Sequence, residues 1–445
     1  MLSETVSNSE WTARAHEAMP HGVSSNFRYW GDEKQIIAKR AKGTYMWDAE
    51  GKKYIDYRLG FGPIILGHAY DEVTDHVAQL MRDGNLFSLT STAEIRAAEA
   101  VKRMTGADKV RFTNSGTESV MHAVRIARAH TNREALLKFE GAYHGSFDYA
   151  MWTTPGTALG AMGSSKSPNP VPSSSGIPKT LYGLTLTLPA GDCDMLAKTL
   201  RERGHQIAAI LVEPVMMNIA SLNPGKAWLQ FLREQCDAYG IVLIFDEVKT
   251  GFRIARGGAQ EYFGVRADLV TYAKAMGNGF PIGAIAGTNE LMMTIERGAV
   301  GQGGTYCGNM VAVAGCEKTL EILEREDVDG AGGTVIGTIG KRGTRLMNGI
   351  HDVLNQHGIP NVISGVPQCF GVIVGASEMP RDYRALQRSV NHKLSSNLMR
   401  GLRERGVLPD PDFQEPWFLC YSLSDDDVDE TLTVLDEVAK SLSLT

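Results

Sequence analysis

Short apolar segments recur along the middle of the chain, and polar or glycine-rich turns follow several of them. These segments are residues 135–139, 207–212, 241–245 and 269–272. Continuous aliphatic runs of this length are typical of parallel strands buried on both faces. Between two of them, residues 227–239 place apolar side chains on one helical face, and Gly240 follows as a helix stop. The order strand–helix–strand predicts an α/β fold with a mostly parallel sheet covered by helices. Ligands bind at the carboxyl ends of the strands in such sheets.

The remainder of the chain predicts a second, smaller unit. Residues 370–374 and 417–422 read as strands, and an apolar helical stripe follows the acidic turn at 425–427. Negative charge at that position suits the positive end of a helix dipole. We therefore expect a large domain over residues 61–320 and a small α+β domain over residues 321–445. The N-terminal segment, residues 1–60, is expected to pack on the small domain.

Composition excludes several classes of protein. The 445 residues carry 45 Lys and Arg against 51 Asp and Glu, a net charge of −6, which argues against a nucleic-acid binder. No apolar run approaches the ~20 residues of a membrane helix, and the N-terminus lacks the apolar region of a secretory signal. Six scattered Cys residues without a CxxC pair predict reduced thiols and no metal site. A cytoplasmic enzyme is the expectation.

A Gly-, Ser- and Pro-rich segment spans residues 153–176. A loop of this length inside a compact domain is usually a functional lid or a disordered insertion. Both interpretations remain open from the sequence.

The segment TNSGTE at residues 113–118 follows an apolar turn and precedes an expected helix at 119–130. Ser115, Gly116 and Thr117 at a helix N-terminus offer backbone N–H groups, hydroxyls and the positive dipole end, which together can hold a phosphate. The alternative is an ordinary N-cap, because Asn, Ser and Thr all cap helices well.

Two strand ends carry ionisable side chains. Asp246 and Glu247 end the strand at 241–245 and should point to opposite faces, since side chains alternate along a strand. Lys274 ends the strand at 269–272 in an Ala, Met and Gly setting. Desolvation there would lower the pKa of its amine and make it a Schiff-base candidate. A structural salt bridge for the acids and a surface position for the lysine are the alternatives.

Together these motifs match the three anchors of pyridoxal 5′-phosphate. The cup would take the phosphate, Asp246 would pair with the pyridinium nitrogen, and Lys274 would form the Schiff base. Tyr143 also follows a strand end and could stack on the cofactor ring. Glu213 and Asn218 follow another and could reach its phenolate side.

From about residue 22 to residue 438 the chain resembles the class III aminotransferases of fold type I. The resemblance is carried by WDAEGKKYIDY, GHAYDEV, RFTNSGTES, KFEGAYHG, LVEP, LIFDEVKTGFR, YAKAMGNGFPIGA and GGTYCGN. It implies that Lys274 is the Schiff-base and proton-shuttling lysine and that Val248 packs under the ring. It also implies a homodimer with shared active sites, in which Thr305 contributes to the phosphate site of the neighbouring subunit.

Within the class, the likeness is to the branch that contains the glutamate-1-semialdehyde 2,1-aminomutases. The segment HGVSSNFR resembles that branch's N-terminal motif and implies a substrate-carboxylate role for Arg28. Glu415 falls on a pocket Glu, and residues 302–305 and the 153–176 loop also match. The pocket entrance departs from the branch by being bulkier and more aromatic, notably at Phe27, Trp30 and Phe61.

The resulting hypothesis is amino transfer between a small-molecule amino donor and a carbonyl acceptor, one of them bearing a carboxylate. The first alternative is the aminomutase, which moves the amino group within one molecule. A racemase or epimerase and a non-catalytic cofactor-binding regulator are further alternatives. A nicotinamide dehydrogenase is disfavoured, because no G-x-G-x-x-G stands at a first strand–helix turn.

Overall fold

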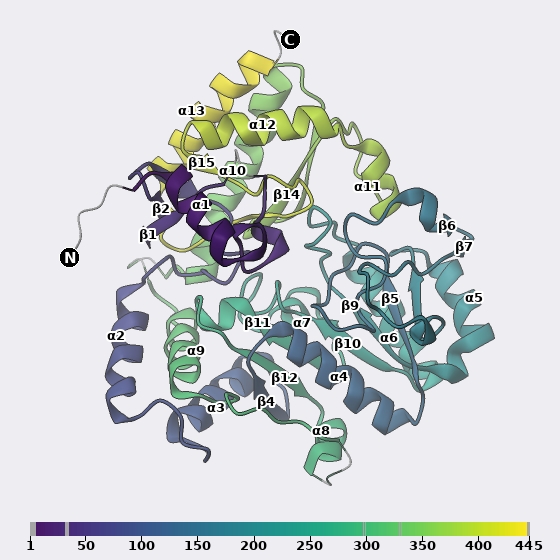
Figure 1. Cartoon of the computed structure of the whole chain (residues 1–445). Coiled ribbons are helices and arrows are strands. Elements are labelled where there is room, and N and C mark those ends of the chain that lie inside the picture. Colours follow the sequence, from purple (N-terminus) through teal and green to yellow (C-terminus); the bar gives the residue numbers. More distant parts are fainter. Residues whose placement is uncertain are drawn as a thin grey trace.

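The computed structural model describes residues 6–31, 35–296, 298, 300–328, 330 and 332–442. Its centre is a seven-stranded sheet in the order β4-β12-β11-β10-β9-β5-β8 (Figure 1). β12 runs antiparallel to both of its neighbours, and the other adjacent pairs are parallel. The expected mostly parallel sheet is therefore confirmed. Its strands are β4 (Lys109–Thr113), β5 (Ala135–Phe139), β8 (Thr185–Leu188), β9 (Ile207–Val212), β10 (Val242–Asp246), β11 (Leu269–Ala273) and β12 (Gly283–Gly287).

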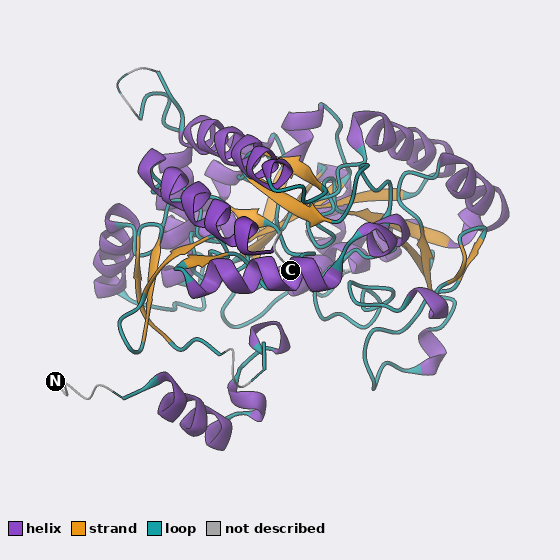
Figure 2. Cartoon of the chain, turned by 90° about the horizontal axis from the view of Figure 1, so that it is seen from above, coloured by secondary structure: helices purple, strands orange, loops and turns teal. Residues whose placement is uncertain are grey.

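Helices cover both faces of this sheet because the strands are apolar on both faces. Val242 and Ile244 of β10 share a buried cluster with apolar side chains of α4 (Gly116–Thr131). Leu243 and Phe245, which alternate with them, belong to the cluster of α6 (Gly225–Tyr239). Figure 2 shows the strands lying between layers of helices. The layered α/β arrangement follows from this alternation.

A second group of elements follows later in the chain. β13 (Asn361–Val366), β14 (Cys369–Val374) and β16 (Trp417–Phe418) form an antiparallel sheet. The helices of this group are α10 (Val335–Gln356), α11 (Tyr383–Ser389), α12 (His392–Glu404) and α13 (Asp425–Leu442). α13 has three aspartates in its first turn, as the sequence predicts.

The strand expected at residues 417–422 is shorter than predicted. Only Trp417 and Phe418 pair with β14, as β16. After Phe418, the backbone N–H groups donate to Gln368, Ile65 and Leu66 in loops, so no regular ladder continues.

The N-terminal strands share a sheet with a strand from far along the chain. β1 (Ala38–Lys42), β2 (Tyr45–Asp48) and β3 (Lys53–Asp56) pair in order, and β15 (Val407–Leu408) adds to β3 in parallel. Helix α1 (Asn8–Ala18) is joined to β2 at its first residue, where Nδ2 of Asn8 donates to Oδ2 of Asp48 at 3.1 Å. The domain boundaries at residues 60 and 320 stay a prediction, and residues 1–5 and 32–34 of the expected N-terminal segment lie outside the described residues.

The other helices of the described chain complete the layers. They are α2 (Asp71–Leu80), α3 (Thr92–Thr105), α5 (Cys193–Arg203), α7 (Ala259–Phe263), α8 (Asn289–Glu296) and α9 (Met310–Leu323). Among the described residues, no helix is both long and apolar enough to cross a membrane. All six cysteines have free thiols.

Buried contacts anchor the Gly-, Ser- and Pro-rich segment 153–176. Arg384 of α11 donates to Glu140 and, at 2.6 and 2.9 Å, to the carbonyls of Gly163 and Met162. The side chains of Arg384 and Glu140 are only 6% and 1% exposed. The hydroxyl of Tyr383 donates to the carbonyl of Thr157 at 3.0 Å. This segment is therefore fixed to α11 in the present conformation.

Replacing Arg384 should destabilise the protein strongly. In Arg384→Met, the Glu140 carboxylate and two loop carbonyls lose their donor while still buried, which should cost about 3–5 kcal/mol. The exposed neighbour Arg381 provides the control, and Arg381→Met should change stability by less than ~0.5 kcal/mol. Urea unfolding followed by circular dichroism measures both variants. Equal midpoints for the two would contradict the anchoring role.

Candidate active site

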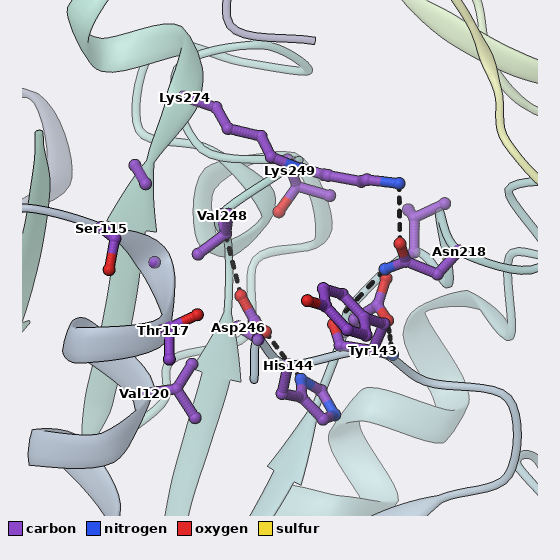
Figure 3. A pocket seen from close by; sticks show the side chains of 16 residues that line it. Ser115, Thr117, Val120, Tyr143, His144, Asn218, Asp246, Val248, Lys249 and Lys274 are labelled. Carbon is purple, nitrogen blue, oxygen red and sulfur yellow. Dashed lines mark hydrogen bonds and ion pairs between the residues drawn. The ribbon is translucent and has the colours of Figure 1, made fainter. Parts of the chain in front are cut away.

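The carboxyl ends of five strands meet at one edge of the central sheet. β4 runs parallel to β11, because both are antiparallel to β12, so its end joins those of β5, β9, β10 and β11. A cavity lies at this edge (Figure 3). Most of the residues predicted from the sequence line it: Ser115, Gly116, Thr117, Tyr143, Glu213, Asn218, Asp246, Val248 and Lys274. Strand direction alone brings them together from positions 115 to 274.

The predicted phosphate cup lies at the N-terminus of α4. Ser115 is the N-cap, and its Oγ accepts a hydrogen bond from the backbone N–H of Glu118 at 3.2 Å. Gly116 is the first helical residue, and a Cβ added there would come within 3.0 Å of Val248. The capping alternative is therefore true of Ser115, but the backbone N–H groups of Gly116 and Thr117, which line the cavity, have no acceptor among the described residues. The cup and the cap are the same structure.

Asp246 and Glu247 point to opposite faces of β10, as predicted. Oδ2 of Asp246 accepts from Nδ1 of His144 at 2.6 Å, and both side chains are almost fully buried. Oδ1 of Asp246 accepts from the backbone N–H of Val248 at 3.0 Å. Glu247 instead accepts from the backbone N–H groups of Ala259 and Gln260 at the start of α7. Asp246 thus serves the cavity and Glu247 caps a helix.

His144 has no role assigned from the sequence, although it directly follows Tyr143. Its Nδ1–H donates to Asp246, and this fixes the carboxylate in one orientation. Its Nε2 is buried and has no hydrogen-bond partner among the described residues. A buried histidine held by a carboxylate is a positioning element for whatever Asp246 binds.

Lys274 follows β11 directly and begins a 3-10 turn, Lys274–Gly277. Its φ angle of 50° lies in the left-handed region, which non-glycine residues adopt at an energetic cost. Burial, and to a smaller extent the Lys249 ammonium, lower the pKa of Lys274 to about 7. Near neutral pH, a large fraction of this amine is therefore unprotonated and nucleophilic.

Glu213 orders the side of the cavity formed by β5 and β9. Its two carboxylate oxygens accept from the backbone N–H groups of Tyr143 and Met217, each at 3.0 Å. Burial raises the pKa of Glu213. The Nδ2 group of Asn218 donates to the carbonyl of Tyr143 at 3.4 Å. These bonds fix the backbone that carries the Tyr143 ring.

Lys249 was not singled out from the sequence, yet it lines the same cavity. Its Nζ lies 2.7 Å from Oε2 of Glu415 and 2.8 Å from Oδ1 of Asn218. The predicted pocket residue Glu415 is therefore already engaged in an ion pair. The signal available in the sequence was the position of Lys249, three residues after Asp246 in the turn that follows β10.

Three predicted residues do not line the cavity, and one of them, Glu415, is connected to it through Lys249. Arg28 lies in the exposed 3-10 turn Asn26–Arg28, and its side chain makes no hydrogen bond or ion pair within the described part of the chain. The adjacent Phe27 ring contacts the Tyr143 ring edge-on at 5.4 Å, so Arg28 lies near the mouth. Thr305 is exposed in a turn outside the cavity. The predicted contribution of Thr305 to the phosphate site of a neighbouring subunit stays a prediction.

The groups at the cavity suit a phosphorylated, nitrogen-containing aromatic aldehyde. A helix N-terminus with glycine at its first position offers N–H donors to a phosphate, and the close approach of Val248 leaves no room there for a side chain. A buried carboxylate, a partly neutral lysine and a tyrosine ring stand at the other walls. No cluster of three metal-ligating side chains occurs among the described residues.

The known proteins that are similar to this chain are consistent with a cofactor site of this kind. A sequence model of the family "Aminotransferase class-III" matches residues 28–438. Glutamate-1-semialdehyde 2,1-aminomutase from Methanothermobacter thermautotrophicus is 38% identical over 98% of this chain and 100% of its own length. An ω-transaminase from Sphaerobacter thermophilus superposes with a TM-score of 0.91 at 28% identity, covering 100% of this chain and 99% of its own. A transaminase solved with pyridoxal phosphate bound gives 0.86 at 27% identity, with the same coverage.

The family match spans nearly the whole chain, and the relatives align over their full length. The predicted fold type and the predicted enzyme class are confirmed. With its lysine, carboxylate and phosphate cup at the converging strand ends, this chain belongs to the class III aminotransferases, which are enzymes that use pyridoxal phosphate.

Proposed function

We propose that the protein transfers an amino group to or from a small molecule that carries a carboxylate, with pyridoxal phosphate held in the cavity of Figure 3. The observation that carries this proposal is the meeting of Lys274, Asp246 and the α4 N-terminus at one buried edge of the sheet. When bound, the cofactor supplies an aldehyde for covalent attachment and a protonated ring that withdraws electrons.

Residues of the chain itself bind and orient the cofactor. The first turn of α4 binds the phosphate through N–H groups and the hydroxyls of Ser115 and Thr117. Asp246, oriented by His144, holds the proton of the ring nitrogen. Tyr143 and Val248 would hold the ring between them, and Asn218 would lie on the side of its phenolate.

Lys274 supplies the nucleophile and the base. Its lowered pKa leaves its Nζ partly unprotonated near pH 7, so it can attack the aldehyde and later take the proton from the substrate Cα. Because its backbone is held in a left-handed conformation at a strand end, the amine enters the cavity from a fixed position. The same amine would carry that proton and release it again within the cavity.

The substrate carboxylate is assigned to Arg28 at the mouth, where a guanidinium can form a bidentate pair. Thr305 is assigned to the phosphate site of a second copy of the chain, in a homodimer with shared sites. Its exposed position outside its own cavity supports this assignment.

The second candidate is the intramolecular reaction of glutamate-1-semialdehyde 2,1-aminomutase. The 38% identity to an aminomutase over its full length favours it. The aromatic side chains at the mouth, Phe27 and Phe61, favour a different carboxylate-bearing substrate.

One assay separates the two candidates. The purified protein in its amino-loaded form is incubated with glutamate 1-semialdehyde and no keto acid, and 5-aminolevulinate is measured. Formation of 5-aminolevulinate over many turnovers would establish the aminomutase. We expect instead that turnover requires a separate keto acid, measured as amino transfer to pyruvate or 2-oxoglutarate from a panel of carboxylate-bearing amines.

Lys274→Ala should lower turnover by at least about 10³-fold, because the variant lacks both nucleophile and base. The absorption band of the covalently held cofactor should also disappear. The exposed helix residue Lys198 provides the control, and Lys198→Ala should keep full activity. Retained turnover in Lys274→Ala would refute the assignment of the lysine.

Arg28→Gln should raise KM for the carboxylate-bearing substrate by about 10- to 100-fold, since a charge-assisted pair contributes about 1.5–3 kcal/mol. The affinity for the cofactor should stay unchanged, because Arg28 lies outside the cofactor cavity. Arg14→Gln, on the exposed face of α1, is the matched control. If KM for an amine without a carboxylate rose equally, Arg28 would not be the carboxylate site.

A further inference from the structure

The second lysine of the cavity, Lys249, is bonded at every donor it has. Its side chain is 7% exposed. Nζ lies 2.7 Å from Glu415 Oε2, 2.8 Å from Asn218 Oδ1 and 3.3 Å from the carbonyl of Met217. Figure 3 shows its side chain extending across the cavity wall toward Asn218.

These three partners require the charged form of Lys249. A carboxylate, an amide oxygen and a backbone carbonyl are all acceptors, and only an ammonium has three N–H donors. A buried ammonium is tolerated where a carboxylate compensates it, and Glu415 provides that charge. Lys249 therefore brings a fixed positive charge into the wall of the cavity that Lys274 enters.

The same contacts fix the amide of Asn218. An ammonium cannot accept a hydrogen bond, so the oxygen of Asn218 must face Lys249 and its NH₂ group must face away. The NH₂ group then donates to the carbonyl of Tyr143 at 3.4 Å, on the side of the cavity. The Tyr143 carbonyl can only accept, so it selects the same orientation of the amide as Lys249 does.

Charges of both signs act on Lys274. The Lys249 ammonium disfavours protonation of Lys274, whereas three carboxylates favour its protonation. The three carboxylates belong to different elements around the cavity. These are Glu213 after β9, Asp246 of β10 and Glu415 before β16. His144, after β5, faces Asp246. Among these described groups, Lys249 is the cation that acts on Lys274.

We propose that Lys249 is a positioning residue of this active site: its ammonium, fixed by Glu415, places a cation in the wall of the cavity that Lys274 enters and, with the Tyr143 carbonyl, orients the amide of Asn218. The role in catalysis rests on the proposed function. The electrostatic effect on Lys274 does not, because it exists in the protein without cofactor. Burial lowers the pKa of Lys274 first, and the Lys249 charge adds to that effect.

The test uses four variants of the full-length protein: Lys249→Met, Glu415→Gln, the double variant and Lys249→Arg. Cofactor-free protein is acetylated with trace acetic anhydride between pH 5 and 10, and mass spectrometry gives the labelling of Lys274 against pH. Cofactor-loaded protein is titrated in parallel through its visible absorption band. Circular dichroism verifies that each variant is folded.

The two single variants should shift the labelling midpoint in opposite directions. Lys249→Met removes the repelling charge and should move the labelling midpoint to higher pH by about 0.5 to 1 pH unit. Glu415→Gln leaves Lys249 uncompensated and should move it to lower pH. The double variant should lie between the two, and Lys249→Arg, which keeps the charge, should stay near the wild type. If Lys249 and Glu415 had a purely structural role, both single variants would shift the labelling midpoint in the same direction.

Equal or unchanged midpoints in Lys249→Met and Glu415→Gln would overturn the proposal. The labelling curve decides this whether or not the cofactor attaches to Lys274. If wild-type protein shows a low labelling midpoint but never gains the cofactor band, the proposed function fails while the effect of Lys249 is still measured. The two failures are therefore distinguishable.

Discussion

The direction of the strands is the constraint on which the site depends. β4, β5, β9, β10 and β11 all end at one edge of the sheet, and each is followed by at least one polar side chain that lines the cavity. A buried sheet edge removes water from these groups, so every charge there acts strongly on its neighbours. The lowered pKa of Lys274 and the raised pKa of Glu213 share this cause, since desolvation disfavours the charged form of each.

Buried ion pairs connect segments that are distant in the sequence. Arg384 binds Glu140 across 244 residues, and Lys249 binds Glu415 across 166. Arg58 binds Asp410 in the same way, with both side chains largely buried. Such pairs add little net stability over apolar packing, but losing one partner is costly. Their effect here is to fix where the C-terminal elements and the 153–176 segment lie around the cavity.

The features that the sequence predicted best depend on local patterns. β5 and β9 match their predicted bounds, because continuous apolar runs with clear ends leave little choice. The opposite orientation of Asp246 and Glu247 follows from the period of a strand alone. The prediction of a strand at 417–422 is wrong beyond Phe418. The strand ends there because the following backbone N–H groups donate to carbonyls of distant loops. Lys249 was missed because its importance comes from Glu415, which no local pattern connects to it.

The charges of the cavity bear on the choice of substrate. Among the described residues of the cavity, Lys249 is paired with Glu415, and the carboxylates of Asp246 and Glu213 act on Lys274, so neither lysine is an uncompensated cation for a substrate carboxylate. Arg58, near the mouth, is paired with Asp410. Within the described residues, Arg28 is the mouth cation without such a partner. A substrate carboxylate would therefore remain at the mouth, close to the ring of Phe27, which contacts both Phe61 and Tyr143. The substrate must then extend from that mouth to Lys274, where its amine reacts. This favours substrates whose carboxylate and amine are separated by a segment that can pack against aromatic side chains.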